Sequence, residues 1–165
     1  MKILALKETK KGENRIAITP DIALKYQKQG YDVFVETKAG ENCNISDKDF
    51  EQIGVKIIKD RSGLDKFDVI IFVNTPDLEK SRLKKDVILI GLIDPFNQKD
   101  KIVEFSKEQI TAFAMEFVPR ITRAQTMDVL SSQSNLAGYR SVIDAIYELN
   151  IATPMMMTAA GTISP

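Results

Sequence analysis

Two apolar runs decide the fold of this chain: "DVIIFV" at residues 68–73 and "DVILIGLI" at residues 86–93. After the leading aspartate, each run is an almost unbroken row of Val, Ile, Leu and Phe, without the alternation of apolar and polar residues. Strands that are buried on both faces have this composition, and they occur in parallel sheets with helices on each side. The two runs therefore predict an α/β fold with a parallel sheet.

Shorter strand signals lie on both sides of these runs. Four more strands are predicted at residues 2–6 ("KILAL"), 32–36 ("DVFVE"), 55–58 ("VKII") and 110–116 ("ITAFAME"). Helix signals separate most of them. Because strands and helices alternate along the chain, we expect a doubly wound, mostly parallel sheet of the Rossmann-like or flavodoxin-like kind.

The clearest helix signal between the strands is "TPDIALKYQKQG". Thr19 is its expected N-cap, Pro20 takes the first helical position, and Gly30 ends the helix. Further helices are predicted at residues 46–54 and 97–109, with a short one at residues 76–86.

Composition excludes several classes of function. The 23 Lys and Arg residues balance the 23 Asp and Glu residues, and a net charge of zero argues against a nucleic-acid binder. The absence of histidine removes Ser–His and Cys–His nucleophilic sites and histidine-bound zinc. A single cysteine, Cys43, excludes an internal disulfide. No apolar run approaches the roughly 18 residues of a spanning helix, so we expect no direct membrane insertion.

Two polar segments are predicted at the carboxyl ends of the strands, where open α/β sheets bind ligands. The first, "KETKKGENRIAITP", follows the first strand and carries Glu8 and Arg15. Composition alone favours an exposed loop here. The chain contains neither a GxGxxG fingerprint nor a Walker A sequence.

The second polar segment, "PRITRAQTMDVLSSQSNLAGYR", follows the sixth strand. Arg120 and Arg123 offer planar forks for carboxamide, carboxylate or phosphate oxygens. Gln125 both donates and accepts, and Asp128 can accept from two ribose hydroxyls. Three serines lie near a helix start. The alternative is a helix-capping region with solvated arginines, and composition leaves the two open.

An amphipathic helix and an apolar tail follow this segment. The apolar face of the helix consists of Tyr139, Val142, Ile143, Ile146 and Leu149. The tail, "IATPMMMTAAGTISP", contains three methionines and no charge. Because both would otherwise stay exposed, we expect association with a second copy or a partner. The tail resembles a connection to a further domain.

Three stretches resemble the alanine dehydrogenase/transhydrogenase family. They are the first polar segment, "KETKKGENRIAITP", the second polar segment with the four residues before it, "MEFVPRITRAQTMDVLSSQSNLAGYR", and the tail, "PMMMTAAGTISP". The resemblance implies two Rossmann-like domains with NAD(H) in the cleft between them. It also implies a mobile loop that reaches over the nicotinamide. Matching motif positions assign Arg120 to the carboxamide and Gln125 and Asp128 to the nicotinamide ribose, with Ser131 as a further ligand.

The second polar segment is similar to the family branch that translocates protons. That branch passes a hydride from NADH to NADP⁺, and the resemblance implies a homodimer with NADP(H)-binding and membrane components as partners. It implies a peripheral location on the cytoplasmic side of the inner membrane. Hydride transfer between nicotinamides needs alignment and exclusion of water, so we expect no catalytic side chain and no metal.

The alanine dehydrogenase branch depends on a histidine and a lysine in this domain. This chain has no histidine, and Phe72 stands where the lysine is expected. Alanine dehydrogenase activity is therefore not expected. Arg15, which holds a substrate carboxylate in that branch, would here line the cleft together with Glu8.

The resemblance divides the chain at residue 126. Residues 1–126 are expected to form the first α/β domain, and residues 127–165 a helix and the start of a connection to an NAD-binding Rossmann domain. Family members continue into a GxGxxG turn that holds the pyrophosphate. We therefore expect weak or no NADH binding by these 165 residues alone, and whether the end at Pro165 is natural stays open. A non-catalytic relict or dimerisation module of the same fold is the alternative.

Overall fold

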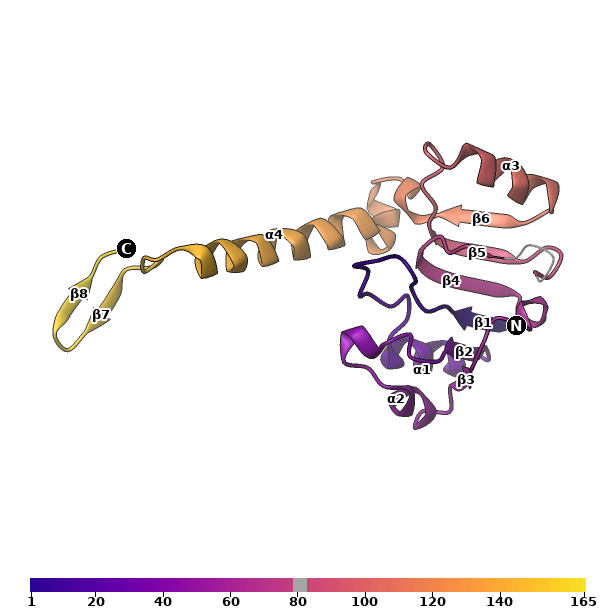
Figure 1. Cartoon of the computed structure of the whole chain (residues 1–165), viewed down its shortest axis with the longest axis horizontal. Coiled ribbons are helices and arrows are strands. Elements are labelled where there is room, and N and C mark those ends of the chain that lie inside the picture. Colours follow the sequence, from indigo (N-terminus) through magenta and orange to yellow (C-terminus); the bar gives the residue numbers. More distant parts are fainter. Residues whose placement is uncertain (79–82) are drawn as a thin grey trace. The chain divides into compact units, whose positions relative to one another are not determined.

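The computed structural model describes residues 1–78 and 83–165 of the chain. They form two compact units, Met1–Val118 and Pro119–Pro165. The first unit is built on a six-stranded sheet, and the second contains one long helix and a hairpin (Figure 1).

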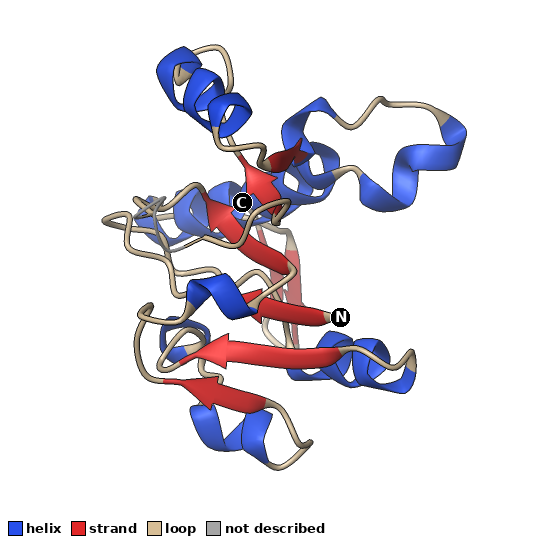
Figure 2. Ribbon diagram, turned by 90° about the vertical axis from the view of Figure 1, so that its right-hand side faces the viewer, coloured by secondary structure: helices blue, strands red, loops and turns tan. Residues whose placement is uncertain are grey.

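The sheet of the first unit is parallel throughout (Figure 2). Its spatial order is β3-β2-β1-β4-β5-β6. The strands are β1 (Lys2–Ala5), β2 (Asp32–Glu36), β3 (Lys56–Ile58), β4 (Val69–Asn74), β5 (Ile88–Leu92) and β6 (Thr111–Ala114). This is the strand order of Rossmann dinucleotide-binding folds. The topological switch point, at which the strand order reverses, lies between β1 and β4. The predicted fold class is confirmed.

A separate hydrophobic cluster covers each face of the sheet. Leu4 and Ile70 lie in one cluster, against Phe105 of α3 (Lys99–Lys107). Ala5 lies in the other, with residues of α1 (Pro20–Lys28) and α2 (Asp47–Glu51). Since consecutive strand residues point to opposite faces, neighbouring residues such as Leu4 and Ala5 pack into different clusters. The sheet is therefore doubly wound, as the continuous apolar runs predict.

Most predicted elements of the first unit form, with small shifts at their ends. Pro20 begins α1 as expected, although Thr19 makes no side-chain capping bond, and Gly30 follows the helix with a φ of 87°. The last strand is shorter than predicted, because residues Met115–Phe117 turn into the 3-10 helix η4. The short helix predicted at residues 76–86 falls largely on residues 79–82, which lie outside the described residues.

The second unit is mostly helical. It contains the 3-10 helix η5 (Thr122–Met127), the helix α4 (Val129–Glu148), and an antiparallel hairpin of β7 (Met156–Thr158) and β8 (Gly161–Ile163). The sequence predicts the helix but not the hairpin in the apolar tail. The apolar side chains of α4 are exposed, with Tyr139 at 70% and Val142 at 60%. Within the described residues, no helix combines the length and apolar character needed to cross a membrane.

Candidate functional site

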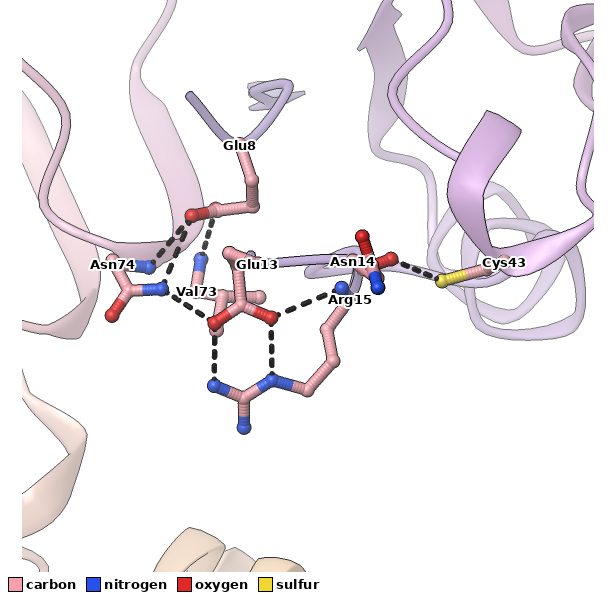
Figure 3. Close-up of polar contacts among 7 residues, drawn as sticks. All are labelled: Glu8, Glu13, Asn14, Arg15, Cys43, Val73 and Asn74. Atoms are coloured by element: carbon pink, nitrogen blue, oxygen red, sulfur yellow. Dashed lines mark hydrogen bonds and ion pairs between the residues drawn. The ribbon is translucent and has the colours of Figure 1, made fainter. Parts of the chain in front are cut away.

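The loop after β1 meets the end of β4 at the topological switch point of the sheet. Glu8 of this loop accepts hydrogen bonds from two main-chain amides, those of Val73 at 2.7 Å and Asn74 at 3.1 Å (Figure 3). The side-chain amide of Asn74 also donates to Glu8, at 3.4 Å. The Glu8 carboxylate therefore fastens the loop to the carboxyl end of β4.

The same loop carries an ion pair between Arg15 and Glu13. The Arg15 guanidinium donates through Nε to Glu13 Oε1 at 2.8 Å and through Nη2 to Oε2 at 2.7 Å (Figure 3). Asn74 Nδ2 donates to Glu13 Oε2 at 2.7 Å. The Glu13 side chain is only 11% exposed, whereas that of Arg15 is 43% exposed. Glu13 thus holds the arginine, and Asn74 holds Glu13.

Charge in this cluster is fixed at neutral pH. The hydrogen bonds from Arg15 lower the pKa of Glu13 from its ordinary value of 4.5 to about 2, although partial burial opposes the shift. The same pair raises the pKa of Arg15. The cluster therefore presents a paired, permanently charged arginine and not a group that exchanges protons near neutrality.

A second carboxylate braces the start of the loop. Glu36, the last residue of β2, accepts from the Lys7 amide at 2.7 Å and from Arg61 Nη2 at 2.9 Å. Arg61 also donates to the Lys7 carbonyl oxygen, at 2.8 Å. In Rossmann folds an acidic residue near this place binds a nucleotide ribose. Here its oxygens hold the chain's own loop.

The cluster at the switch point contains two residues that the sequence analysis did not single out, Glu13 and Asn74. Asn74 left a signal, because it is the polar residue that ends the apolar run of β4 at the ligand edge. Glu13 lies in a segment with many charged residues, and no sequence pattern distinguishes it from the others. The pairing of these two residues depends on tertiary structure.

Phe72 is not part of this cluster. Its side chain is 3% exposed and belongs to the hydrophobic core, where it packs over Gly91 of β5. A β-carbon placed on Gly91 would lie only 2.3 Å from Phe72 Cδ2. The residue of β4 that reaches the switch point is Asn74, so the identity of Phe72 carries no information about chemistry at this edge.

The second polar segment forms a capped helix start. Asp128 is the N-cap of α4, and its Oδ1 accepts from the Ser131 amide at 2.9 Å. Asp128 Oδ2 accepts from Ser131 Oγ at 2.6 Å. These bonds lower the pKa of Asp128, and the charge of Arg120 acts in the same direction. Asp128 is therefore ionised at neutral pH and keeps lone pairs for further donors.

The other predicted ligands of this segment are exposed. Gln125 belongs to η5, and Arg120 precedes it. Ala124 is the buried residue of η5, at 5% exposure, and the polar residues on either side of it are exposed. Within each unit, the structure brings Glu8 and Arg15 together with Glu13 and Asn74, and it brings Asp128 together with Ser131.

Residues 4–137 match the family model described as the N-terminal domain of alanine dehydrogenase/PNT. The chain belongs to this family. It is 45% identical over 99% of its length to the first part of the NAD(P) transhydrogenase alpha subunit of Rickettsia prowazekii, and 42% identical to that of Rhodospirillum rubrum. It covers 44% and 45% of those two proteins, so the chain spans less than half the length of these relatives.

Solved structures of the alanine dehydrogenase/PNT family agree. The crystal structure of transhydrogenase from Sinorhizobium meliloti matches with a TM-score of 0.90 and 41% identity, over 99% of this chain and 49% of that one. An L-alanine dehydrogenase matches less closely, with a TM-score of 0.67 and 25% identity, over 72% of this chain and 33% of that one. Both the fold and the family resemblance inferred from the sequence are confirmed.

Proposed function

We propose that this chain supplies the first domain of the NAD(H)-binding component of a proton-translocating NAD(P) transhydrogenase. The observation that carries the proposal is the set of polar groups before and at the start of α4, in a chain with high similarity to transhydrogenase subunits. Arg120 and Gln125 are exposed, and Asp128 is an ionised acceptor paired with Ser131. This is the donor and acceptor set that a nicotinamide and its ribose require.

The donors and acceptors of these side chains fit the parts of the cofactor. Arg120 would donate to the carboxamide oxygen of the nicotinamide. Gln125 and Asp128 would bind the ribose hydroxyls, with Ser131 as a further ligand and as the donor that orients Asp128. Glu8 and Arg15 would line the cleft from the sheet edge.

The bound cofactors supply the chemistry, a hydride passed from NADH to NADP⁺. The chain's own residues bind, orient and exclude water, and none is required as a general acid or base. Under this proposal residues 1–126 are the first domain, and residues 127–165 are the helix and connection toward a nucleotide-binding domain. The partners are a second copy, an NADP(H)-binding component and a membrane component on whose cytoplasmic side the unit sits.

Titration of the chain with NADH tests the proposal. Because no GxGxxG turn lies in these 165 residues, we expect NADH binding too weak for calorimetry but visible at millimolar NADH as shifts of the Arg120, Gln125 and Asp128 NMR signals. Micromolar affinity would contradict the proposal that part of the NADH site lies outside these 165 residues. NADH-dependent shifts that fall on other residues and not on these three would contradict the clamp assignment.

Two arginines of the segment provide a matched comparison. Arg120→Ala should abolish the NADH-dependent shifts, whereas Arg123→Ala, at a neighbouring exposed position, should leave them in place. Equal loss in both variants would show that only general positive charge matters. Incubation with alanine and NAD⁺ should yield no NADH, and its production would favour an amino-acid dehydrogenase instead.

A further inference from the structure

The segment that carries Arg120, Gln125 and Asp128 follows η4 in the chain, and η4 is tied to the neighbouring strand. Glu116 in the middle of η4 accepts through Oε1 from the Ile93 amide at 2.9 Å and from the Asp94 amide. These amides follow the last residue of β5, 23 and 22 positions earlier in the sequence than Glu116. One carboxylate oxygen therefore joins the ends of two adjacent strands just before the polar segment begins.

The turn that Glu116 holds has a fixed conformation of its own. Asp94 adopts a positive φ of 55°, which is uncommon for a residue other than glycine. Asn97 Nδ2 donates to both carboxylate oxygens of Asp94 at 3.0 Å, and the Asn97 and Gln98 amides donate to the Asp94 carbonyl oxygen. The turn from Ile93 to Gln98 is thus a well-defined support for η4.

A second contact joins the same two elements. The rings of Phe96, in the turn, and Phe117, in η4, meet edge to face with centroids 5.2 Å apart. Phe96 is 74% exposed and Phe117 51% exposed, so the pair contributes little to the hydrophobic core. Its effect is a second fastening of η4 to the turn.

Both hydrogen bonds go to a single carboxylate oxygen of Glu116. Its second oxygen, Oε2, is buried, and among the described residues it has no hydrogen-bond partner. A buried, unpaired carboxylate oxygen is costly, and a glutamine could accept the same two amide bonds. The Oε1 hydrogen bonds and the Phe96–Phe117 ring contact together join η4 to the turn at two points.

We infer that Glu116 and Phe117 are positioning residues that fasten the base of the nicotinamide-binding segment to the turn after β5. They act through the chain, because η4 ends at Phe117, three positions before Arg120. The effect on nicotinamide binding rests on the proposed function, whereas the attachment of η4 to the turn does not. The two are measured separately below.

The test compares backbone order in variants of the 165-residue chain by ¹⁵N relaxation. In the wild type, the residues of η4, Met115–Phe117, should have order parameters near those of rigid backbone, about 0.85, and in Glu116→Ala and Phe117→Ala they should fall below about 0.6. Glu116→Gln retains an oxygen for both amides and should restore the wild-type order. Phe96→Ala removes the other ring of the pair and should have the same effect as Phe117→Ala. Because Phe96 is the more exposed of the two, this variant does not disturb the hydrophobic core.

Phe113 provides the matched control. It is an aromatic residue of β6 with 54% exposure, close to that of Phe117, and it is not part of the edge-to-face pair. Phe113→Ala should leave the order of η4 unchanged. Loss of order in this control, or unchanged order in both Glu116→Ala and Phe117→Ala, would overturn the inference, as would a Glu116→Gln variant that behaves like the alanine variant.

The link to function has its own measurement. Where millimolar NADH shifts the Arg120 and Gln125 signals, the apparent affinity in Glu116→Ala should fall roughly tenfold while that of Phe113→Ala is retained. Equal affinity in all variants would overturn the positioning role. A wild-type chain in which NADH shifts other residues and not these would contradict the proposed function, and the relaxation comparison would still decide the fastening.

Discussion

The guanidinium of Arg15 and the carboxylate of Glu13 form two parallel hydrogen bonds, of 2.8 and 2.7 Å, at the topological switch point of the sheet. The two residues are near neighbours in the sequence, yet the pair is held from outside by Asn74, 61 positions away from Glu13. A local charge pair thus becomes part of the junction between β1 and β4.

The pH dependence of stability should report this pair. The pKa of Glu13 is lowered from 4.5 to about 2, so the ionised carboxylate stabilises the folded state above about pH 4.5, and this contribution is lost as the pH falls toward 2. In urea unfolding, the stability advantage of the wild type over Glu13→Gln should therefore shrink across that interval. Glu51→Gln, an exposed carboxylate of α2, is the control. A constant difference between wild type and Glu13→Gln from pH 5 to about pH 2 would refute the prediction.

Removal of the Glu8 side chain should loosen the junction of the loop with β4. Glu8→Ala leaves the amides of Val73 and Asn74 without their acceptor, which should reduce the free energy of unfolding by about 1–3 kcal/mol. Glu8→Gln keeps one oxygen acceptor and should lose less. Hydrogen exchange at the Val73 and Asn74 amides locates the effect. Equal exchange rates in the alanine variant and the wild type would show that these bonds do not protect the strand end.

The cap of α4 provides a test within the second unit. Asp128→Ala removes the acceptor for the Ser131 amide and should fray the first turn of the helix, whereas Asp128→Asn keeps an acceptor and should preserve most of it. Because the Ser131 hydrogen bonds lower the pKa of Asp128, the cap should weaken as the pH falls through the range in which this carboxylate becomes protonated. Amide signals of residues 129–133 measure the fraying. Identical fraying in both variants would mean that the carboxylate charge alone stabilises the turn.

Two glycines should respond in opposite ways to alanine. At Gly91 the new methyl group would lie 2.3 Å from Phe72 Cδ2 and 2.5 Å from the Phe72 carbonyl oxygen, and overpacking of this kind costs about 1–3 kcal/mol. At Gly138, inside α4, nothing lies within 4 Å, and alanine should stabilise the helix by about 0.5–1 kcal/mol. Denaturation followed by residue-specific signals of the sheet and of α4 measures the two stability changes separately. A neutral Gly91→Ala would mean that Phe72 can move out of the way.

Sequence by itself determined the architecture of this protein, because the physical cause of the architecture is local. The continuous apolar runs at residues 68–73 and 86–93 indicate burial on both faces, which is typical of a parallel sheet between two helical layers. Family motifs in the same sequence pointed to the polar residues from Arg120 to Ser131. Each of these signals is contained in a short stretch of chain.

Only the tertiary structure decided which polar groups meet. The strand order placed β1 beside β4, and this neighbourhood joined Glu8 and Glu13 to Asn74. It also put Phe72 in the core and Asn74 at the edge, although the two residues lie close together on one strand. Such contacts join residues more than 60 positions apart, and their geometry depends on the packing of the whole sheet and leaves no periodic trace in the sequence.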